Sequence, residues 1–185
     1  MVTQTTFAAM QEAELAWWAN FMGHPTAKQR MWALYGARYY GFFFAEMLNP
    51  GKTVEIGSGP LPVMEVMNAP QCIAVDSLKY EGLTDWSLFD ASQVPDGWAD
   101  TVLLLNVLDH TDDPQALIDE AWRMLIPGGK ALVFVHLGQQ DDKHRLVEQE
   151  DVEAWLSAFE IQRSWVEAPV IYDPAAYLAV AVKSA

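Results

Sequence analysis

Acidic residues and glycines follow short apolar runs in this sequence, in a pattern that could bind a nucleoside. The run 53–56 leads into Gly57 and Gly59, which let the backbone turn sharply and approach a ligand with no Cβ in the way. Glu55 places a carboxylate beneath that turn, where it would suit a ligand with a positively charged amino group. The next apolar run ends at Asp76, which is placed to accept hydrogen bonds from two ribose hydroxyls.

A parallel sheet is needed to hold these residues together. The apolar runs are β-branched or leucine-rich and are apolar at successive positions, which is typical of strands buried on both faces. We expect such strands at 53–56, 72–76, 101–108 and 131–137, a weaker one at 86–90, and two further strands at 160–166 and 176–182. A helix capped by Asp113, with Pro114 first and Pro127-Gly128-Gly129 at its end, should precede the 131–137 strand, and another should lie near 149–159. The alternation predicts an α/β fold with a doubly wound, mostly parallel sheet.

The amino-terminal part of the chain has a different character. Residues 7–21 and 26–48 are rich in Ala, Met, Leu and aromatic side chains and predict two helices. No repeat and no long linker separates them from the rest. We therefore expect a single domain, 1–185, with a helical cap over 1–48 and the sheet-containing core over 49–185.

Polar residues interrupt the apolar runs at the predicted carboxyl ends of five strands. They are Glu55 to Gly59, Asp76, Asp90, Asn106 and His136. Ligands of doubly wound sheets bind beyond these ends, where the strand order reverses. Each position alone is weak evidence, because every strand must end somewhere, but together they predict one site.

Five segments carry a family resemblance in order and at matching spacings: VEIGSGP (54–60), AVDSL (74–78), LFDASQVP (88–95), WADTVLLLNVLDHTDDP (98–114) and ALIDEAWRMLIPGGKALVFVHL (116–137). The chain resembles the class I S-adenosylmethionine-dependent methyltransferases, within the small-molecule group called type 11. The resemblance implies a Rossmann-like fold with a seven-stranded sheet, S-adenosyl-L-methionine as cofactor and a small-molecule acceptor.

The resemblance also implies where the cofactor would lie. Its contacts would be Glu55, Gly57 and Gly59 on the methionine part; Asp76 on the ribose; Leu78, Asp90 and Ala91 on the adenine; and Asn106 and Val107 beneath it, with Ser58 and Ser77 as further cofactor contacts. In similar enzymes an amino-terminal helix covers the cofactor, which adds Tyr35 and Arg38. The sequence departs from the family at Leu61, where a third glycine is usual, and at Asp109, where glutamate is usual.

Methyl transfer from a sulfonium is an in-line displacement, so it mainly requires an acceptor held close and aligned in a dry pocket. Where the acceptor must lose a proton, His110 and His136 are the catalytic candidates, because both should lie near the ligand edge of the sheet. We expect no metal site. Asp141, Asp142 and His144 share one polar loop that is most simply a solvated segment.

Composition narrows the class of protein. A formal charge of −14 disfavours nucleic acid as a partner, and no apolar run approaches the roughly 20 residues that span a bilayer, so we expect no membrane insertion. No secretory signal is visible, which predicts a cytoplasmic protein. The aromatic amino-terminal helices, if exposed, could form a homodimer surface.

Two other functions use the same architecture. A nicotinamide-dependent oxidoreductase normally has a third glycine at position 62, which is Pro62 here. A domain that binds S-adenosylmethionine or S-adenosylhomocysteine without catalysis, in a regulatory or scaffolding role, stays open, since the chain leaves little room for an acceptor-binding lid.

Overall fold

The sheet is the centre of the computed structural model, which describes residues 6–67, 69–78, 80, 87–88, 90–169 and 174–184, without the side chains of residues 32, 34–38, 40, 66, 87 and 88. The strands are β1 (Lys52–Ile56), β2 (Gln71–Val75), β3 (Ser87–Leu88), β4 (Ala99–Leu105), β5 (Leu125–Leu137), β6 (Glu160–Glu167) and β7 (Ala175–Val182). Among the described residues these seven strands form one sheet in the order β3-β2-β1-β4-β5-β7-β6. The first five run parallel, whereas β7 is antiparallel to both of its neighbours. The predicted mostly parallel α/β fold is confirmed.

The strand order reverses between β1 and β4. From β1 the chain adds β2 and β3 on one side and then crosses to add β4 on the other. Ile56 at the end of β1 is level with Val75 of β2 and Leu104 of β4, so three carboxyl ends meet at this switch point.

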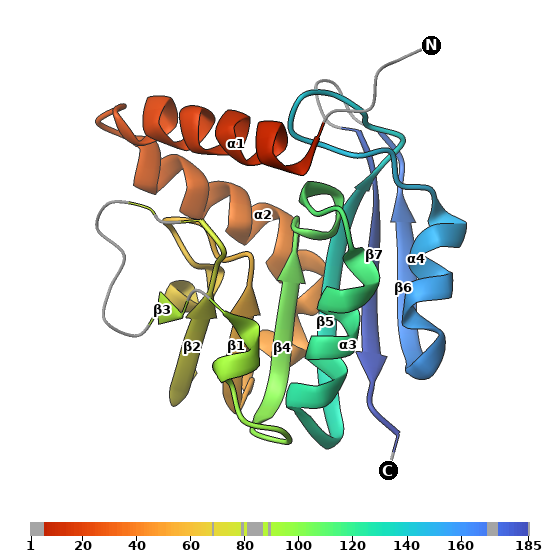
Figure 1. Ribbon diagram of the computed structural model, residues 1–185. Coiled ribbons are helices and arrows are strands. Elements are labelled where there is room, and N and C mark those ends of the chain that lie inside the picture. The colour runs from red at the N-terminus through yellow and green to blue at the C-terminus, as the bar shows by residue number, and fades with distance from the viewer. Residues whose placement is uncertain are drawn as a thin grey trace.

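Helices cover both faces of the sheet (Figure 1). The α-helices are α1 (Phe7–Met22), α2 (Ala27–Leu48), α3 (Pro114–Met124) and α4 (Gln149–Trp155), and the 3-10 helices are η1 (Val63–Val66), η2 (Ala91–Gln93), η3 (Leu108–His110) and η4 (Leu156–Ala158). α2 lies behind the sheet in Figure 1 and α3 and α4 lie in front of it, while α1 crosses above the carboxyl ends of the parallel strands. This placement makes α1 the element nearest the switch point from outside.

Two apolar clusters hold these layers together. On one face Tyr39, Phe43 and Met47 of α2 pack with strand residues such as Leu103 and Phe134. The other face has a separate cluster with Ile118 and Met124 of α3 and Val152 of α4. Both faces of β4 are therefore buried, as its unbroken apolar run predicted.

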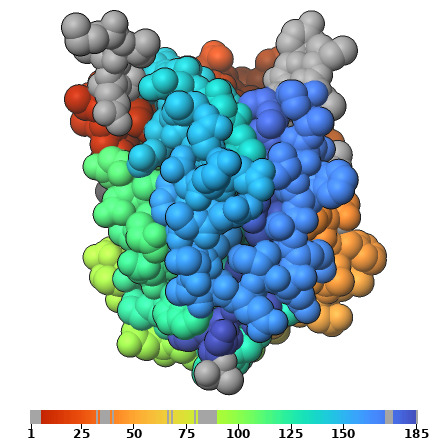
Figure 2. Space-filling view, turned by 90° about the vertical axis from the view of Figure 1, so that its right-hand side faces the viewer, coloured from red at the N-terminus to blue at the C-terminus, as the bar shows by residue number. Residues whose placement is uncertain are grey.

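β6 forms the edge of the sheet between the two helical layers. Figure 2 looks at this edge, with α2 (orange) on one side and α3 and α4 (green to light blue) on the other. Most side chains of β6 are exposed, including Trp165. No helix in the described part of the chain is both long and apolar enough to span a membrane.

Several predicted boundaries were wrong: β5 begins at Leu125 and not at 131, α4 ends at Trp155 and not near 159, and α3 and β4 end earlier than expected. α3 begins as expected, with Asp113 accepting a hydrogen bond from the Ala116 amide at 3.0 Å, but it ends at Met124 because Leu125 already takes extended backbone and begins β5. β4 ends at Leu105 and not at residue 108, because Asn106 has a φ of 60°. A residue in the left-handed region cannot continue a strand.

Candidate functional site

The glycine turn follows β1 at the switch point. Gly57 and Gly59 have φ angles of 73° and 57°, which side chains rarely tolerate. A Cβ on Gly57 would lie 2.2 Å from Cγ2 of Val107, and one on Gly59 would lie 3.1 Å from the ring of Trp18. The turn therefore needs glycine both for its backbone and for close packing by Val107, which follows β4, and by Trp18 of α1.

Glu55 lies beneath this turn, as the sequence predicted. Its carboxylate is 3% exposed and accepts hydrogen bonds from the amides of Val63 and Met64, both at 2.9 Å. Burial raises the pKa of Glu55 to about 8, although these two amides oppose the shift. The side chain thus anchors η1 to the end of β1 as well as bordering the cavity described below.

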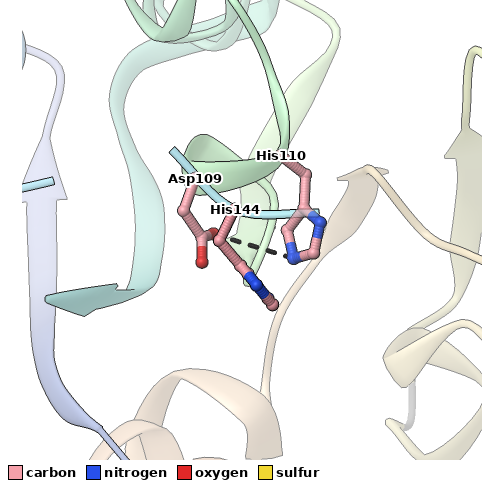
Figure 3. A group of neighbouring side chains, drawn as sticks. All are labelled: Asp109, His110 and His144. Carbon is pink, nitrogen blue, oxygen red and sulfur yellow. Dashed lines mark ion pairs between the residues drawn. The ribbon is translucent and has the colours of Figure 1, made fainter. Parts of the chain in front are cut away.

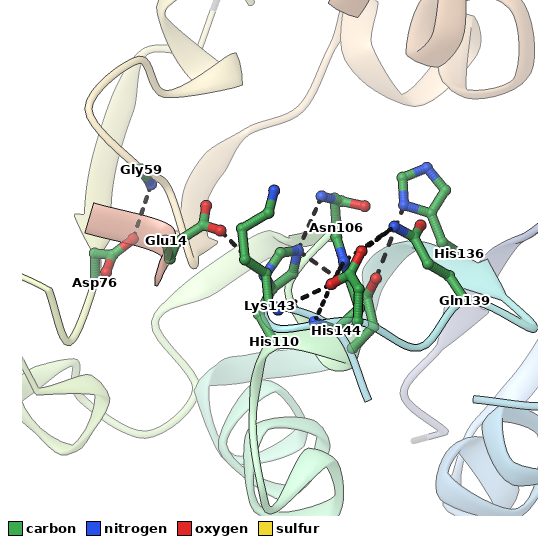
Figure 4. A network of polar contacts seen from close by, with 11 residues as sticks. Glu14, Gly59, Asp76, Asn106, His110, His136, Gln139, Lys143 and His144 are labelled. Carbon is green, nitrogen blue, oxygen red and sulfur yellow. Dashed lines mark hydrogen bonds and ion pairs between the residues drawn. The ribbon is translucent and has the colours of Figure 1, made fainter. Parts of the chain in front are cut away.

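Asp76 connects the first two strand ends. One carboxylate oxygen accepts a hydrogen bond from the Gly59 amide at 2.8 Å (Figure 4), and the other accepts one from the Leu78 amide at 2.8 Å. Burial raises its pKa, and the two amides act in the opposite direction. Asp76 therefore holds the glycine turn of β1 against the turn that follows β2.

A cavity of about 500 Å³ opens over these turns. Its floor is formed by the carboxyl ends of β1, β2 and β4, and α1 forms its roof. Of the residues predicted to bind the cofactor, these line it: Glu55, Gly57, Ser58, Gly59, Asp76, Ser77, Leu78, Ala91, Asn106 and Val107. The volume is in the range of small-molecule sites, which usually measure roughly 300–1,000 Å³.

Asp90 is not brought to this cavity. Its carboxylate is exposed and accepts a hydrogen bond from the Ser92 amide at 2.9 Å, which caps η2. Hydrogen bonds from Ser92 lower its pKa. Asp90 therefore caps the helix that follows β3, and its neighbour Ala91 lines the cavity.

The two predicted catalytic histidines differ in their position relative to the cavity. His110 lines the cavity, with Asn106 Nδ2 3.3 Å from its Nε2 and a Glu14 oxygen 3.4 Å from its Nδ1. Burial, reinforced by the nearby His144, lowers the pKa of His110 to about 3, so the ring is neutral at physiological pH. His136 is not among the described residues that line the cavity; it is buried in β5 with Nδ1 3.8 Å from an oxygen of Asp109.

The side chains of Tyr35 and Arg38 lie outside the described part of the structure. Their predicted contacts with the cofactor remain predictions.

α1 supplies the largest set of wall residues that the sequence analysis missed. They are Phe7, Met10, Gln11, Glu14, Trp17, Trp18 and Phe21. Their spacing of three and four residues puts them on one face of the helix. Gln11 and Glu14 within that otherwise apolar face were the available signal, because polar side chains are rarely placed on a face that only packs against a core.

The loop after β5 supplies Lys143 and His144. The expectation that residues 141–144 form a solvated segment was wrong for His144, which is 7% exposed and has Nδ1 2.6 Å from an oxygen of Asp141. Lys143 lies with its ammonium 4.7 Å from the ring centre of Trp17 and so links this loop to α1. Sequence alone gave no sign that the loop folds back over the cavity.

The sequence matches a family model described as a methyltransferase domain over residues 55–133. That segment begins at Glu55 and ends within β5, so it spans most of the cavity floor. No curated protein matches the sequence.

Many solved structures share the fold, at identities that establish the fold alone. A SAM-dependent methyltransferase from Archaeoglobus fulgidus is 14% identical with a TM-score of 0.64, covering 82% of this chain and 94% of that chain. A 1,6-didemethyltoxoflavin-N1-methyltransferase from Burkholderia thailandensis, solved with its namesake compound and S-adenosylhomocysteine, is 14% identical with a TM-score of 0.66, covering 96% and 88%. The N-methyltransferase NodS from Bradyrhizobium japonicum is 14% identical with a TM-score of 0.61, covering 82% and 98%. These findings confirm the resemblance to class I methyltransferases that the five motifs predicted.

Proposed function

Because residues 55–133 match the methyltransferase-domain family and the chain has the class I methyltransferase fold, we propose that this protein is an enzyme that binds S-adenosyl-L-methionine in the cavity over β1, β2 and β4 and transfers its methyl group to a small-molecule acceptor. The observation that carries the proposal is the cavity itself, which joins the glycine turn, Glu55 and Asp76 in one wall.

The two turns suit opposite halves of the cofactor. Each carboxylate oxygen of Asp76 accepts one backbone amide and has further acceptor capacity for a ribose hydroxyl. Leu78 lines the same part of the cavity and offers an apolar contact for adenine. Glu55 and the turn of Gly57 to Gly59 border the part that would receive the methionine ammonium group and sulfonium.

α1 suits the role of a roof over a cationic ligand. Trp17 and Trp18 line the cavity from above, and Trp18 also packs against Gly59. Aromatic faces attract cations, and a sulfonium is a cation. The apolar side chains of α1 also exclude water from the cavity, and methyl transfer requires a dry pocket.

The acceptor would lie at the opposite end of the cavity from Asp76. Figure 4 shows Asp76 and Gly59 at one end of the polar network, and His110, Lys143 and His144 further along it. In the proposed step the acceptor atom forms a bond to the methyl carbon while the carbon–sulfur bond breaks, and sulfur keeps the electron pair to give S-adenosylhomocysteine. A neutral acceptor takes over the positive charge and releases a proton to solvent. The chain's contribution is to hold both reactants in line.

Calorimetry tests the binding half of the proposal. We expect S-adenosylmethionine and S-adenosylhomocysteine to bind and NAD not to bind. Asp76→Ala should weaken both by about 10- to 100-fold, which corresponds to about 1–3 kcal/mol. Asp100→Ala is the matched control, because Asp100 accepts a backbone amide from Lys52 at 2.8 Å at the opposite end of the sheet. Folded protein that fails to bind either cofactor form would refute the proposal.

An acceptor screen tests the transfer half. Purified protein is incubated with S-adenosylmethionine and a panel of small hydroxyl, amine and acidic carbon compounds, and release of S-adenosylhomocysteine is measured. Turnover that depends on one acceptor class supports the proposal. Tight binding without turnover across the panel would contradict catalysis.

A further inference from the structure

Three side chains that can ligate a metal ion meet beside the cavity. Asp109 and His110 belong to η3, and His144 reaches them from the loop after β5 (Figure 3). One ligand atom from each lies within 4.8 Å of the other two. We call Asp109, His110 and His144 the η3 cluster.

Backbone contacts fix this arrangement, although the loop and η3 are far apart in sequence. The amide of Arg145 donates to the carbonyl oxygen of Asp109 at 2.8 Å, which sets His144 directly beside η3. The Arg145 guanidinium also donates to the carbonyl oxygen of Asp112 at 2.9 Å. The η3 cluster is therefore positioned by main-chain bonds and does not depend on a chance side-chain approach.

Asp109 is the unusual member. It is fully buried, and neither carboxylate oxygen has a hydrogen-bond donor in suitable geometry among the described residues. The other buried acids are satisfied: Glu55 and Asp76 accept backbone amides, and Glu46 pairs with Arg163 at a distance of 3.1 Å. A buried carboxylate without donors or a cation is costly, so its retention here needs a reason.

The atoms around Asp109 share this property. Among the described residues, Nδ1 of His110, one oxygen of Glu14 and the side-chain oxygen of Asn106 are also buried without a hydrogen-bond partner. All three residues line the cavity next to the η3 cluster. Nδ1 of His110 and the Glu14 oxygen lie 3.4 Å apart and face each other, so the oxygens of Asp109 and Asn106 are the buried lone pairs that a cation would satisfy.

An outer layer of contacts orients the ligand groups as in metal sites. Asp141 lies 2.6 Å from Nδ1 of His144, so a proton held there leaves Nε2 of that ring with a free lone pair. Carboxylates that hold the second nitrogen of a histidine ligand in this way are a recurrent feature of metal centres. Nδ1 of His136 lies 3.8 Å from the second oxygen of Asp109, so His136 is placed behind Asp109 as Asp141 is placed behind His144.

We propose that Asp109, His110 and His144 bind a divalent transition-metal ion of the zinc type at the wall of the cavity. Two imidazoles with one carboxylate favour Zn²⁺ and similar ions over Mg²⁺ or Ca²⁺, which prefer oxygen ligands. The 4.8 Å separation exceeds the roughly 3–3.5 Å between ligands of an ion with bonds of about 2.0–2.1 Å, so the side chains close around the ion as it binds.

The position of the ion assigns it a role, and this step rests on the proposed function. His110 and His144 line the end of the cavity that we give to the acceptor. An ion held there would contact an acceptor oxygen and lower the pKa of its hydroxyl, so that the proton would leave to solvent water before the oxygen attacks the methyl carbon.

Metal titration of chelator-treated protein tests the proposal without any acceptor. We expect one equivalent of Zn²⁺ to bind with Kd below about 1 µM, and Co²⁺ to give visible absorption bands that report nitrogen and oxygen ligation. His144→Ala should weaken Zn²⁺ binding at least 100-fold. His24→Ala is the matched control, because it removes an exposed histidine far from the η3 cluster along the chain and should change nothing.

Two further variants keep the test decisive. Asp141→Asn, which changes only the group behind His144, should weaken Zn²⁺ binding about 10- to 100-fold. Asp109→Asn should remove the rise in melting temperature that Zn²⁺ gives the unaltered protein, while the apo variant stays folded because a buried charge has been removed.

Binding of S-adenosylhomocysteine separates this proposal from the proposed function. His144→Ala should lose the metal and keep S-adenosylhomocysteine, whereas Asp76→Ala should do the reverse. Wild-type protein that binds no Zn²⁺, or His144→Ala protein that binds it as tightly as His24→Ala protein, would overturn the metal site.

Discussion

Replacing Gly57 with alanine tests whether the glycine turn is built as described. The new Cβ would lie 2.2 Å from Cγ2 of Val107 and 2.6 Å from its Cβ, and the backbone φ of 73° would remain. A side chain in the left-handed region costs about 1–2 kcal/mol, and overpacking costs typically about 1–3 kcal/mol more. We therefore expect Gly57→Ala to lower the free energy of unfolding by about 2–5 kcal/mol.

Gly97→Ala separates the two contributions. Gly97 has a φ of 59°, but a Cβ there would meet nothing within 4 Å. This variant should lose only the backbone part, about 1–2 kcal/mol. Urea unfolding followed by circular dichroism measures both variants, and their difference reports the clash with Val107.

The same change has a consequence for binding. Val107 lines the cavity, so a displaced Val107 should weaken S-adenosylhomocysteine binding in Gly57→Ala but not in Gly97→Ala. The double variant Gly57→Ala/Val107→Ala should be more stable than the sum of the single effects predicts, because the 2.2 Å contact with Cγ2 of Val107 is removed, although the 2.6 Å contact with the Cβ at position 107 remains. Equal losses of stability in Gly57→Ala and Gly97→Ala would refute the close approach of Val107 to the turn.

Two more predictions concern Glu55 and α1. Burial raises the pKa of Glu55 from 4.5 to about 8, so the folded chain holds this proton more tightly than the unfolded chain. The stability that protonated Glu55 contributes is fully present below pH 4.5 and declines as pH rises through about 8. Glu55→Gln should remove that decline when the free energy of unfolding is measured across this pH range. A variant with an unchanged pH profile would disprove the raised pKa of Glu55. Trp18→Ala should weaken S-adenosylhomocysteine binding at least tenfold because it opens the roof over Gly59, whereas Trp165→Ala, which removes an exposed tryptophan of β6, should leave it unchanged; equal affinities in calorimetry would exclude a roof at Trp18.

Much of the fold could be predicted because the sheet is buried on both faces. The run 102–105 is apolar at every position, which is typical of a strand covered by helices on both sides, so the pattern predicts parallel strands and, from them, the edge where ligands bind. Asp113 and Pro114 likewise fix the start of α3 through local hydrogen bonding. These patterns depend on residues that are close in sequence, so they can be recognised without knowledge of the tertiary structure.

The parts of the site that were missed depend on contacts between distant segments. His144 lies in a polar loop, and bonds between distant segments, such as those of Arg145 to Asp109 and Asp112, bring it to η3. Asp90 was predicted at a strand end facing a ligand. Its carboxylate instead accepts a hydrogen bond from the Ser92 amide, caps η2 and is exposed. Loop conformation decides both outcomes, and polar composition does not predict it.

A crystal structure of the protein grown with S-adenosylhomocysteine tests the central claim most directly. The account predicts adenosine in the cavity beneath α1, with its ribose hydroxyls on the carboxylate of Asp76 and its amino acid part over Gly57 and Gly59. The ligand bound at another place, or an unfilled cavity at saturating ligand, would contradict it.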